Sequence, residues 1–225
     1  DHFTETVGDY DTVADHVVMK NDELHGFLLN AIPFSSDRQF SATDLGCGTG
    51  HGMKLILDHF PHVFLTGVDF SARMIEKSRA HLANFSDRLS LVEGDFTTFD
   101  FPQKQDAIVS AVSIHNIPHE DKVKLFGKIF AALNPGGVFI NADFVEGEVS
   151  EINEQYRTIY ERFLRANLSG TELDVWLHHA FVQDMPMKLT QQFAALRTCG
   201  FENCQLLWQF NNQAVYIATK PLAAV

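Results

Sequence analysis

The sequence predicts an α/β protein with a doubly wound, mostly parallel sheet, a C-terminal antiparallel hairpin and a helical lid. Five short apolar segments alternate with amphipathic helical patterns between residues 40 and 145, and such alternation is typical of a parallel sheet. A glycine-rich turn joins the first apolar segment to the first helical pattern. Near the C-terminus, two alternating segments flank Asn211-Asn212-Gln213 and predict the hairpin.

Length and composition are those of one globular domain. The chain has 225 residues, of which 45% are hydrophobic and 20% are charged, so it can bury a core and is not disordered. No segment approaches the ~18 consecutive apolar residues of a membrane-spanning helix. The first residues show neither the basic start nor the apolar centre of a secretory signal. We therefore expect a cytoplasmic protein.

Cysteine content and charge narrow the class of partner. The chain has three cysteines and no Cys-x-x-Cys motif, so we expect reduced thiols and no zinc knot. Its formal net charge of −12 repels phosphate backbones and disfavours nucleic-acid substrates. A small-molecule substrate is favoured instead, and the 20 phenylalanines are enough for a core and an apolar pocket. A homodimer is compatible with the sequence.

The glycine-rich turn is the first candidate binding element. Residues 40–45 form an apolar, β-prone segment, and Gly46, Gly48 and Gly50 follow it before a helical pattern begins. Glycine tolerates positive φ and has no Cβ, so a ligand can contact the backbone, and the amides at the helix start face a negative group. A dinucleotide fingerprint needs its third glycine where this chain has His51, and the Gly-Lys-Ser/Thr of a P-loop does not occur.

Acidic residues follow the second and third predicted strands. Asp69 closes the strand at residues 63–69, where a carboxylate can accept hydrogen bonds from both hydroxyls of a ribose. The alternative is that Asp69 only caps the next helix, which Ser71 is also able to begin. Asp95 follows the strand at residues 89–93, and its alternative role is that of a plain turn residue.

The fourth and fifth strands complete the predicted parallel sheet. Residues 106–112 are almost entirely apolar, as a central parallel strand should be, and residues 138–144 follow an amphipathic helix at residues 122–133. Ligands of such sheets bind at the carboxyl ends of the strands. The glycine turn, both acids and residues 111–116 all lie at those ends, so we expect them to form one site.

These motifs resemble those of one enzyme family. Residues 44–50, which read Asp-Leu-Gly-Cys-Gly-Thr-Gly, resemble the first motif of class I S-adenosylmethionine (SAM) dependent methyltransferases of the small-molecule type. Gly-Asp-Phe at residues 94–96 resembles the motif whose aspartate binds the adenine amine, and Leu-x-Pro-Gly-Gly at residues 133–137 is a further match. The resemblance covers residues 40–145 by motif and 188–220 by pattern, and it implies a Rossmann-like fold.

The resemblance implies SAM as the cofactor and suggests the residues that bind it. An aromatic residue near the N-terminus often closes over SAM in this family, which suggests Tyr10, although a surface or packing role is equally compatible. Asp69 would bind the ribose, and Asp95 the adenine, with Phe96 against the ring. The implied cofactor-binding residues are Tyr10, Gly46, Cys47, Gly48, Asp69, Phe70, Met74, Asp95, Phe96 and Ala111.

We expect a single methyltransferase domain over residues 1–225. Its parts are an N-terminal helical cap (1–34), a SAM-binding core (40–145), a helical lid insertion (146–187), and the last helix with the hairpin (188–220). The apolar spacing from Tyr10 to Ile32 indicates one helix in the cap. For the insertion, the alternative to a lid is a helical pair that extends the core or forms a dimer face.

His115, just past the fourth strand, is the candidate catalytic base, because histidine transfers protons near neutral pH. It can equally act as an orienting hydrogen-bond donor or a packing residue. We expect no metal site, because no pair of histidines four residues apart lies on one helix with a carboxylate partner. In addition, adjacent His178 and His179 point to different faces of a helix, so at most one faces a given site. The residues considered for such a site are His115, His119, Glu120, Asp121, His178 and His179.

The implied function is methyl transfer from SAM to the oxygen, nitrogen or carbon of a small-molecule acceptor, with S-adenosylhomocysteine as product. No Asn-Pro-Pro-Tyr-like signature of nucleic-acid amino methylases follows the fourth strand. One alternative is an enzyme similar to the carboxy-SAM synthases, which need a cation near the methyl group, and no arginine is obviously placed for it. Another is a non-catalytic SAM-binding domain. His51 argues against an NAD-dependent oxidoreductase.

Overall fold

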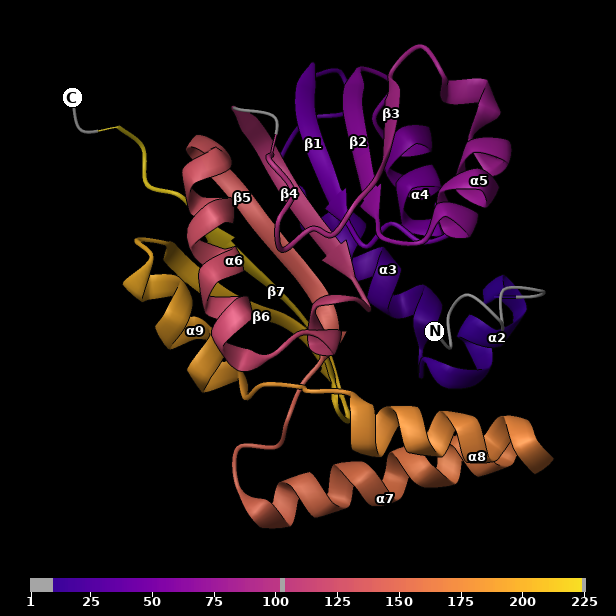
Figure 1. Ribbon diagram of the computed structural model, residues 1–225. Helices are drawn as coiled ribbons and strands as arrows, with labels where there is room; N and C mark the ends of the chain where they lie inside the picture. Colours follow the sequence, from indigo (N-terminus) through magenta and orange to yellow (C-terminus); the bar gives the residue numbers. More distant parts are fainter. Residues whose placement is uncertain (1–9, 102–103, 224–225) are drawn as a thin grey trace.

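The structure is a computed structural model that describes residues 10–101 and 104–223. Its centre is one seven-stranded sheet in the order β3-β2-β1-β4-β5-β7-β6 (Figure 1). Strands β1 to β5 are parallel, and β7 pairs antiparallel with both β5 and β6. The predicted fold is therefore confirmed. The strands are β1 (Phe40–Leu45), β2 (Val63–Asp69), β3 (Leu89–Glu93), β4 (Gln105–Ala111), β5 (Leu133–Phe144), β6 (Glu202–Phe210) and β7 (Gln213–Thr219).

The order of the strands reverses beside β1. The chain passes from β1 outward to β2 and β3, then returns to the other side of β1 and continues with β4 and β5. The loops after β1 and β4 therefore leave the sheet in opposite directions. Such a reversal opens a crevice at the carboxyl ends of the strands, where ligands of doubly wound sheets bind.

Helices cover both faces of the sheet and enclose two hydrophobic cores. Side chains of α4 belong to one core, and those of α6 and α9 belong to the other. Within β5, Ile140 lies in the first core and its neighbour Phe139 in the second, because successive side chains of a strand point to opposite faces. None of the described helices is long and apolar enough to cross a bilayer. The helices that join or follow the strands are α4 (His51–His59), α5 (Ala72–His81), α6 (His119–Ala132) and α9 (Leu189–Thr198).

The N-terminal region differs from the prediction of a single helix. It forms two helices, α2 (Tyr10–Val17) and α3 (Asn21–Asn30). Lys20, between them, adopts the left-handed conformation with a φ of 55°. The three residues before Lys20 are each 4% exposed, and three consecutive residues cannot all face one side of a continuous helix. The turn at Lys20 allows all three to be buried.

The insertion after β5 forms α7 (Ser150–Asn167), α8 (Gly170–His178) and a short π-helical turn, η3 (His179–Gln183). Helix α7 packs against both α2 and α8. The hydroxyl of Tyr160 donates a hydrogen bond to the carbonyl oxygen of Val17 at 2.8 Å. These helices lie beyond the carboxyl ends of the strands (Figure 1). The N-terminal helices and the insertion therefore form one helical layer, although they are distant in sequence.

Gly26, in the middle of α3, offers a test of the packing in this layer. A Cβ added to Gly26 meets no heavy atom within 4 Å. We expect Gly26→Ala to raise the free energy of unfolding, measured by urea denaturation, by about 0.5–1 kcal/mol, because alanine restricts the unfolded chain. Gly200→Ala is the opposing control, since at a φ of 103° its Cβ would lie 2.8 Å from the ring of Phe130. A stabilisation by Gly200→Ala, or none by Gly26→Ala, would contradict this packing.

Candidate active site

A cavity of about 520 Å³ lies at the carboxyl ends of the central strands. The loop after β1, the ends of β2 and β4, the loop after β3, and helices α2 and α3 form its wall. The side chain of Tyr10 lies outside the described residues. None of the described residues in 146–187 lines the cavity, so the lid role of the insertion stays a prediction. The other nine predicted cofactor residues all line it: Gly46, Cys47, Gly48, Asp69, Phe70, Met74, Asp95, Phe96 and Ala111.

The glycine turn allows two loops to approach each other closely. Gly46, Gly48 and Gly50 have φ values of 74°, 53° and 88°, which favour glycine. A Cβ on Gly46 would lie 1.9 Å from Oγ of Ser113, in the loop after β4. A Cβ on Gly48 would meet no heavy atom within 4 Å. Gly46 is therefore required for the contact between the loops, whereas Gly48 is required only for its backbone conformation.

Asp69 is held through both carboxylate oxygens. Its Oδ2 accepts a hydrogen bond from the amide of Gly48 at 2.9 Å, and its Oδ1 accepts one from the amide of Ser71 at 2.9 Å. The hydroxyl of Ser71 accepts from the amide of Met74 and so begins α5, as predicted. Burial raises the pKa of Asp69 above its ordinary value, although the two backbone hydrogen bonds lower it. Asp69 thus supports the start of α5 and also lines the cavity.

Asp44, which sequence reasoning did not select, lies on the same wall as Asp69. It is 5% exposed. Burial raises the pKa of Asp44 to about 7, and the negative charge of Asp69 adds to this effect. The available sequence signal was its place at the start of the glycine motif. Two interacting carboxyl groups therefore lie in one wall of the cavity.

Helices α2 and α3 supply a second wall, whose individual residues sequence reasoning did not identify. Asp15, Asp22 and His25 line the cavity from these helices, and His51 lines it from the start of α4. Burial lowers the pKa of His25 below its ordinary value, so its imidazole is neutral at neutral pH. Five aspartates line the cavity, and no lysine or arginine does so among the described residues. Such a wall favours neutral or positively charged ligands.

Asp95 and Phe96 reach the cavity from the loop after β3. Oδ1 of Asp95 accepts a hydrogen bond from the amide of Thr97 at 2.8 Å, which is the turn role considered from the sequence. Phe96 is 8% exposed and belongs to the second core. The turn role of Asp95 is therefore compatible with a place on the cavity wall.

His115, the predicted catalytic base, is not among the residues that line the cavity. It is 3% exposed, its Nδ1 lies 2.6 Å from Oδ1 of Asp143, and its amide donates to Oδ2 of Asp143 at 2.8 Å. Burial lowers the pKa of His115, but the charges of Asp143 and Asp184 outweigh this and raise it above its ordinary value. Ser113 and Asn116, on either side, do line the cavity. The catalytic role of His115 stays a prediction.

Comparisons with known proteins show the family of the chain. Residues 42–137 match the family described as a methyltransferase domain. The carboxy-S-adenosyl-L-methionine synthase of Aeromonas hydrophila is 30% identical over 183 residues, which cover 79% of this chain and 73% of that protein. The chain belongs to the class I SAM-dependent methyltransferase family. A second relative of this methyltransferase, also named carboxy-S-adenosyl-L-methionine synthase and from Nautilia profundicola, is 24% identical over 189 residues, or 83% of this chain and 80% of the relative.

Solved structures share the fold of this methyltransferase. Human N-acetylserotonin methyltransferase in complex with SAM has a TM-score of 0.62 and 18% identity over 88% of this chain. The alignment covers only 51% of the human chain, so this chain spans about half of its length. The Haloferax volcanii methyltransferase, solved with the activator Trm112, has a TM-score of 0.69 and 16% identity over 98% of both chains. At these identities the likeness shows the fold alone.

SAM is the cofactor of this methyltransferase, and the cavity fits it. Its volume of about 520 Å³ falls within the usual range for small-molecule sites, about 300–1,000 Å³. Buried carboxyl groups at the wall can accept hydrogen bonds from hydroxyl and ammonium groups. Met74 and Phe96, which both line the cavity and are largely buried, suit an aromatic ring.

Proposed function

We propose that this methyltransferase transfers the methyl group of SAM to an oxygen, nitrogen or carbon atom of a neutral or positively charged small molecule. The proposal rests on the composition of the cavity wall, with five aspartates and, in the described part of the chain, no lysine or arginine. A sulfonium or ammonium group is attracted to such a wall, whereas an anionic acceptor is repelled. The negative charge of the whole chain acts in the same direction.

SAM supplies a methyl group already activated by its sulfonium, so the chain mainly has to position the reactants and exclude water. In this proposal, Asp69 accepts hydrogen bonds from the ribose hydroxyls, and Asp95 accepts one from the adenine amine beside Phe96. Asp44 faces the ammonium of the cofactor. The free amides at the start of α4 face its carboxylate, because helix N-termini favour negative groups.

We propose a positioning role for His115 instead of direct proton transfer. Its ring is held by Asp143, whereas Ser113 and Asn116 of the same loop line the cavity. A base is needed only for an acceptor that is protonated at the working pH. His115 would then affect turnover through the loop that contacts the reactants.

The second candidate is a carboxy-SAM synthase. It is favoured by the names of the two relatives, which match 79% and 83% of this chain. A carboxyl group carried by SAM is anionic and needs a positive partner. The absence of lysine and arginine from the described cavity wall makes this the second choice.

Asp69→Asn tests the cofactor site. We expect wild type to bind SAM and S-adenosylhomocysteine with micromolar affinity in isothermal titration calorimetry, without binding NAD. The variant should bind SAM more weakly by roughly 1–3 kcal/mol, because asparagine keeps only one acceptor oxygen for the ribose hydroxyls and the amides of Gly48 and Ser71. Glu93→Gln, an exposed acid at the end of adjacent β3, is the matched control and should bind as wild type does. An unchanged affinity in Asp69→Asn would remove Asp69 from the site.

Product analysis separates the two candidate functions. The full chain is incubated with SAM and a panel of metabolites that includes carboxylic acids as possible carboxyl donors, and the products are identified by mass spectrometry. A methylated metabolite together with S-adenosylhomocysteine supports methyl transfer. Carboxylated SAM without any methylated metabolite supports the second candidate. Light scattering on the same preparation tests whether the chain forms a homodimer.

A further inference from the structure

We propose that His115, His179 and Asp184 bind a divalent transition-metal ion of the Zn²⁺ type between the insertion and the sheet. None of the three is among the described residues that line the cavity, so this site is separate from the cofactor site. His115 comes from the turn η2 (Ile114–Asn116) after β4, and the other two come from the end of the insertion. Two imidazoles and one carboxylate form a donor set that suits Zn²⁺.

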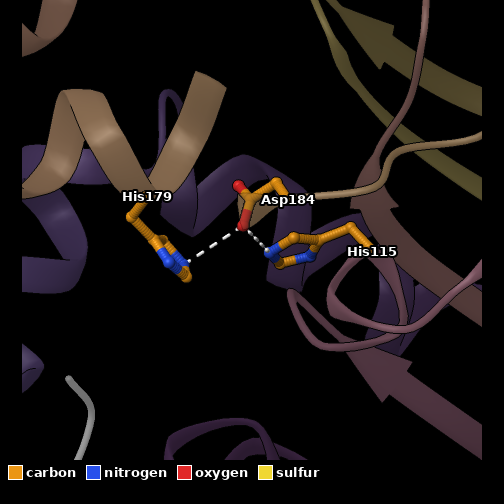
Figure 2. Close-up of side chains that lie close together, drawn as sticks. All are labelled: His115, His179 and Asp184. Carbon is orange, nitrogen blue, oxygen red and sulfur yellow. Dashed lines mark ion pairs between the residues drawn. The ribbon is translucent and has the colours of Figure 1, made fainter. Parts of the chain in front are cut away.

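The three side chains converge on one point (Figure 2). Oδ1 of Asp184 lies 3.2 Å from Nε2 of His179 and 3.7 Å from Nε2 of His115. One ligand atom from each residue lies within 4.8 Å of the other two. Zn²⁺ holds such ligands at about 2.0–2.2 Å, so in a tetrahedron they are about 3.3 Å apart. Two spacings are already close to this value, and the third has to shorten by at most about 1.5 Å.

In their neutral state, both histidines can present a ring lone pair to this point. Nδ1 of His115 lies 2.6 Å from Oδ1 of Asp143, and Nδ1 of His179 lies 3.0 Å from Oε1 of Gln183. Because these oxygens are acceptors, each Nδ1 carries the proton, and a neutral ring then has its lone pair on Nε2. Metal-bound histidines usually donate their other ring N–H to such an oxygen, which fixes the tautomer and the orientation of the ring.

The carboxylate supplies the observation that decides for a cation. Oδ1 of Asp184 is buried and accepts no hydrogen bond from the described residues. The side chains of His115, His179 and Asp184 are 3%, 8% and 8% exposed, so they are largely shielded from water. Among the described residues its neighbours are the two imidazoles, which form ion pairs with it only when their rings are protonated. With neutral rings no positive charge faces this buried oxygen, which is unfavourable, and a metal ion between it and the two ring nitrogens would supply that charge.

The local charge also favours a cation. Asp143 and Asp184 are the two carboxylates next to the histidines. Lys122 is 1% exposed and donates to the carbonyl oxygen of Met185 at 2.7 Å. When both imidazoles are neutral, these two carboxylates and one ammonium leave this part of the described structure net negative.

The π-helical turn η3 brings two of the ligands together. The amide of Asp184 donates to the carbonyl oxygen of His179 at 3.0 Å and closes this turn; such turns are frequent at functional sites. His178, one residue earlier, is exposed. The amide of Met185 donates to the carbonyl oxygen of His115 at 3.0 Å, which joins η3 to the core. A metal ion here would fasten the end of the insertion to the loop after β4.

Metal titration of the full chain tests the proposal. The chelator-treated and dialysed protein is titrated with Zn²⁺ in a calorimeter, and with Co²⁺ while the visible absorption is recorded. We expect one Zn²⁺ per chain, a Co²⁺ d–d band typical of nitrogen and oxygen ligands, and a higher thermal midpoint with Zn²⁺, because the folded state binds the ion. His179→Ala should lower the Zn²⁺ affinity by roughly 100-fold or more.

His178→Ala is the matched control, because His178 is the adjacent histidine and is exposed. This variant should bind Zn²⁺ as wild type does. Asp184→Asn is a second ligand variant, and the SAM affinity of each variant reports whether it is folded. If wild type binds no stoichiometric Zn²⁺, or if His178→Ala and His179→Ala lose equal Zn²⁺ affinity, the proposal is wrong. His115, His179 and Asp184 would then interact only through protons, without a metal ion.

Discussion

Asp44→Asn is expected to stabilise the SAM-free protein far more at about pH 8 than at about pH 4. Burial raises the pKa of Asp44 from 3.8 to about 7, so between these values the folded state keeps a proton that the unfolded state has released. The stability due to this group is complete below pH 3.8 and is lost as the pH rises towards 7. The side chain of asparagine does not titrate in this range, so Asp44→Asn does not lose stability in this way as the pH rises.

The expected difference is large. A pKa raised from 3.8 to about 7, at 1.36 kcal/mol per unit, corresponds to about 4 kcal/mol. Urea denaturation of both proteins across this pH range measures it. Asp22→Asn removes an exposed carboxyl from the same cavity, and its unfolding should follow that of wild type. If the stability difference between wild type and Asp44→Asn is the same at both ends of the range, the pKa of Asp44 is not raised.

Gly46→Ala is expected to lower the free energy of unfolding by about 2–4 kcal/mol. Two effects add: the new Cβ overpacks the contact with the loop after β4, and alanine is unfavourable in the left-handed conformation. The added Cβ would lie 1.9 Å from Oγ and 2.5 Å from Cβ of Ser113, and the φ of Gly46 is 74°. Gly48→Ala separates the two effects, because its Cβ would meet no heavy atom. For Gly48→Ala, the free energy of unfolding should fall by only about 1–2 kcal/mol, which is the cost of placing alanine in the left-handed conformation.

A double-mutant cycle tests the contact itself. Ser113→Gly removes the two atoms that lie within 3 Å of the new Cβ of Gly46→Ala, so it should restore part of the lost stability. The same change should leave the effect of Gly48→Ala unaltered. Denaturation of the single and double variants measures both couplings. The absence of any rescue would mean that the loops after β1 and β4 do not meet as described.

The parallel sheet was predictable because each of its signals is local. The apolar run of β4, the glycine turn after β1 and the cap at Ser71 depend on only a few neighbouring residues. Boundaries moved where pairing extends a strand: β5 begins at Leu133 because this residue pairs with Gln105 beyond a register shift. The break at Lys20 was not predictable, since it follows from burial of the preceding residues in the helical layer.

The candidate site was predictable on the side formed by the strand ends, where motifs identify the residues. Asp15, Asp22 and His25 lie on helices whose position depends on tertiary packing, so no local pattern indicates that they line the cavity. The raised pKa of Asp44 likewise depends on burial in the folded chain. Asp184 meets His115 only because η3 folds back onto the loop after β4, which explains why helix spacing alone gave no sign of a carboxylate partner.

The hydroxyl of Tyr160 connects the insertion to Val17, the last residue of α2, and other residues of α2 line the cavity. An outward movement of α2 would therefore have to break this hydrogen bond or carry α7 with it. Two stretches of chain that synthesis separates widely are thus coupled beside the cavity. We expect a change in α7 that removes this hydrogen bond to alter how long a bound cofactor stays.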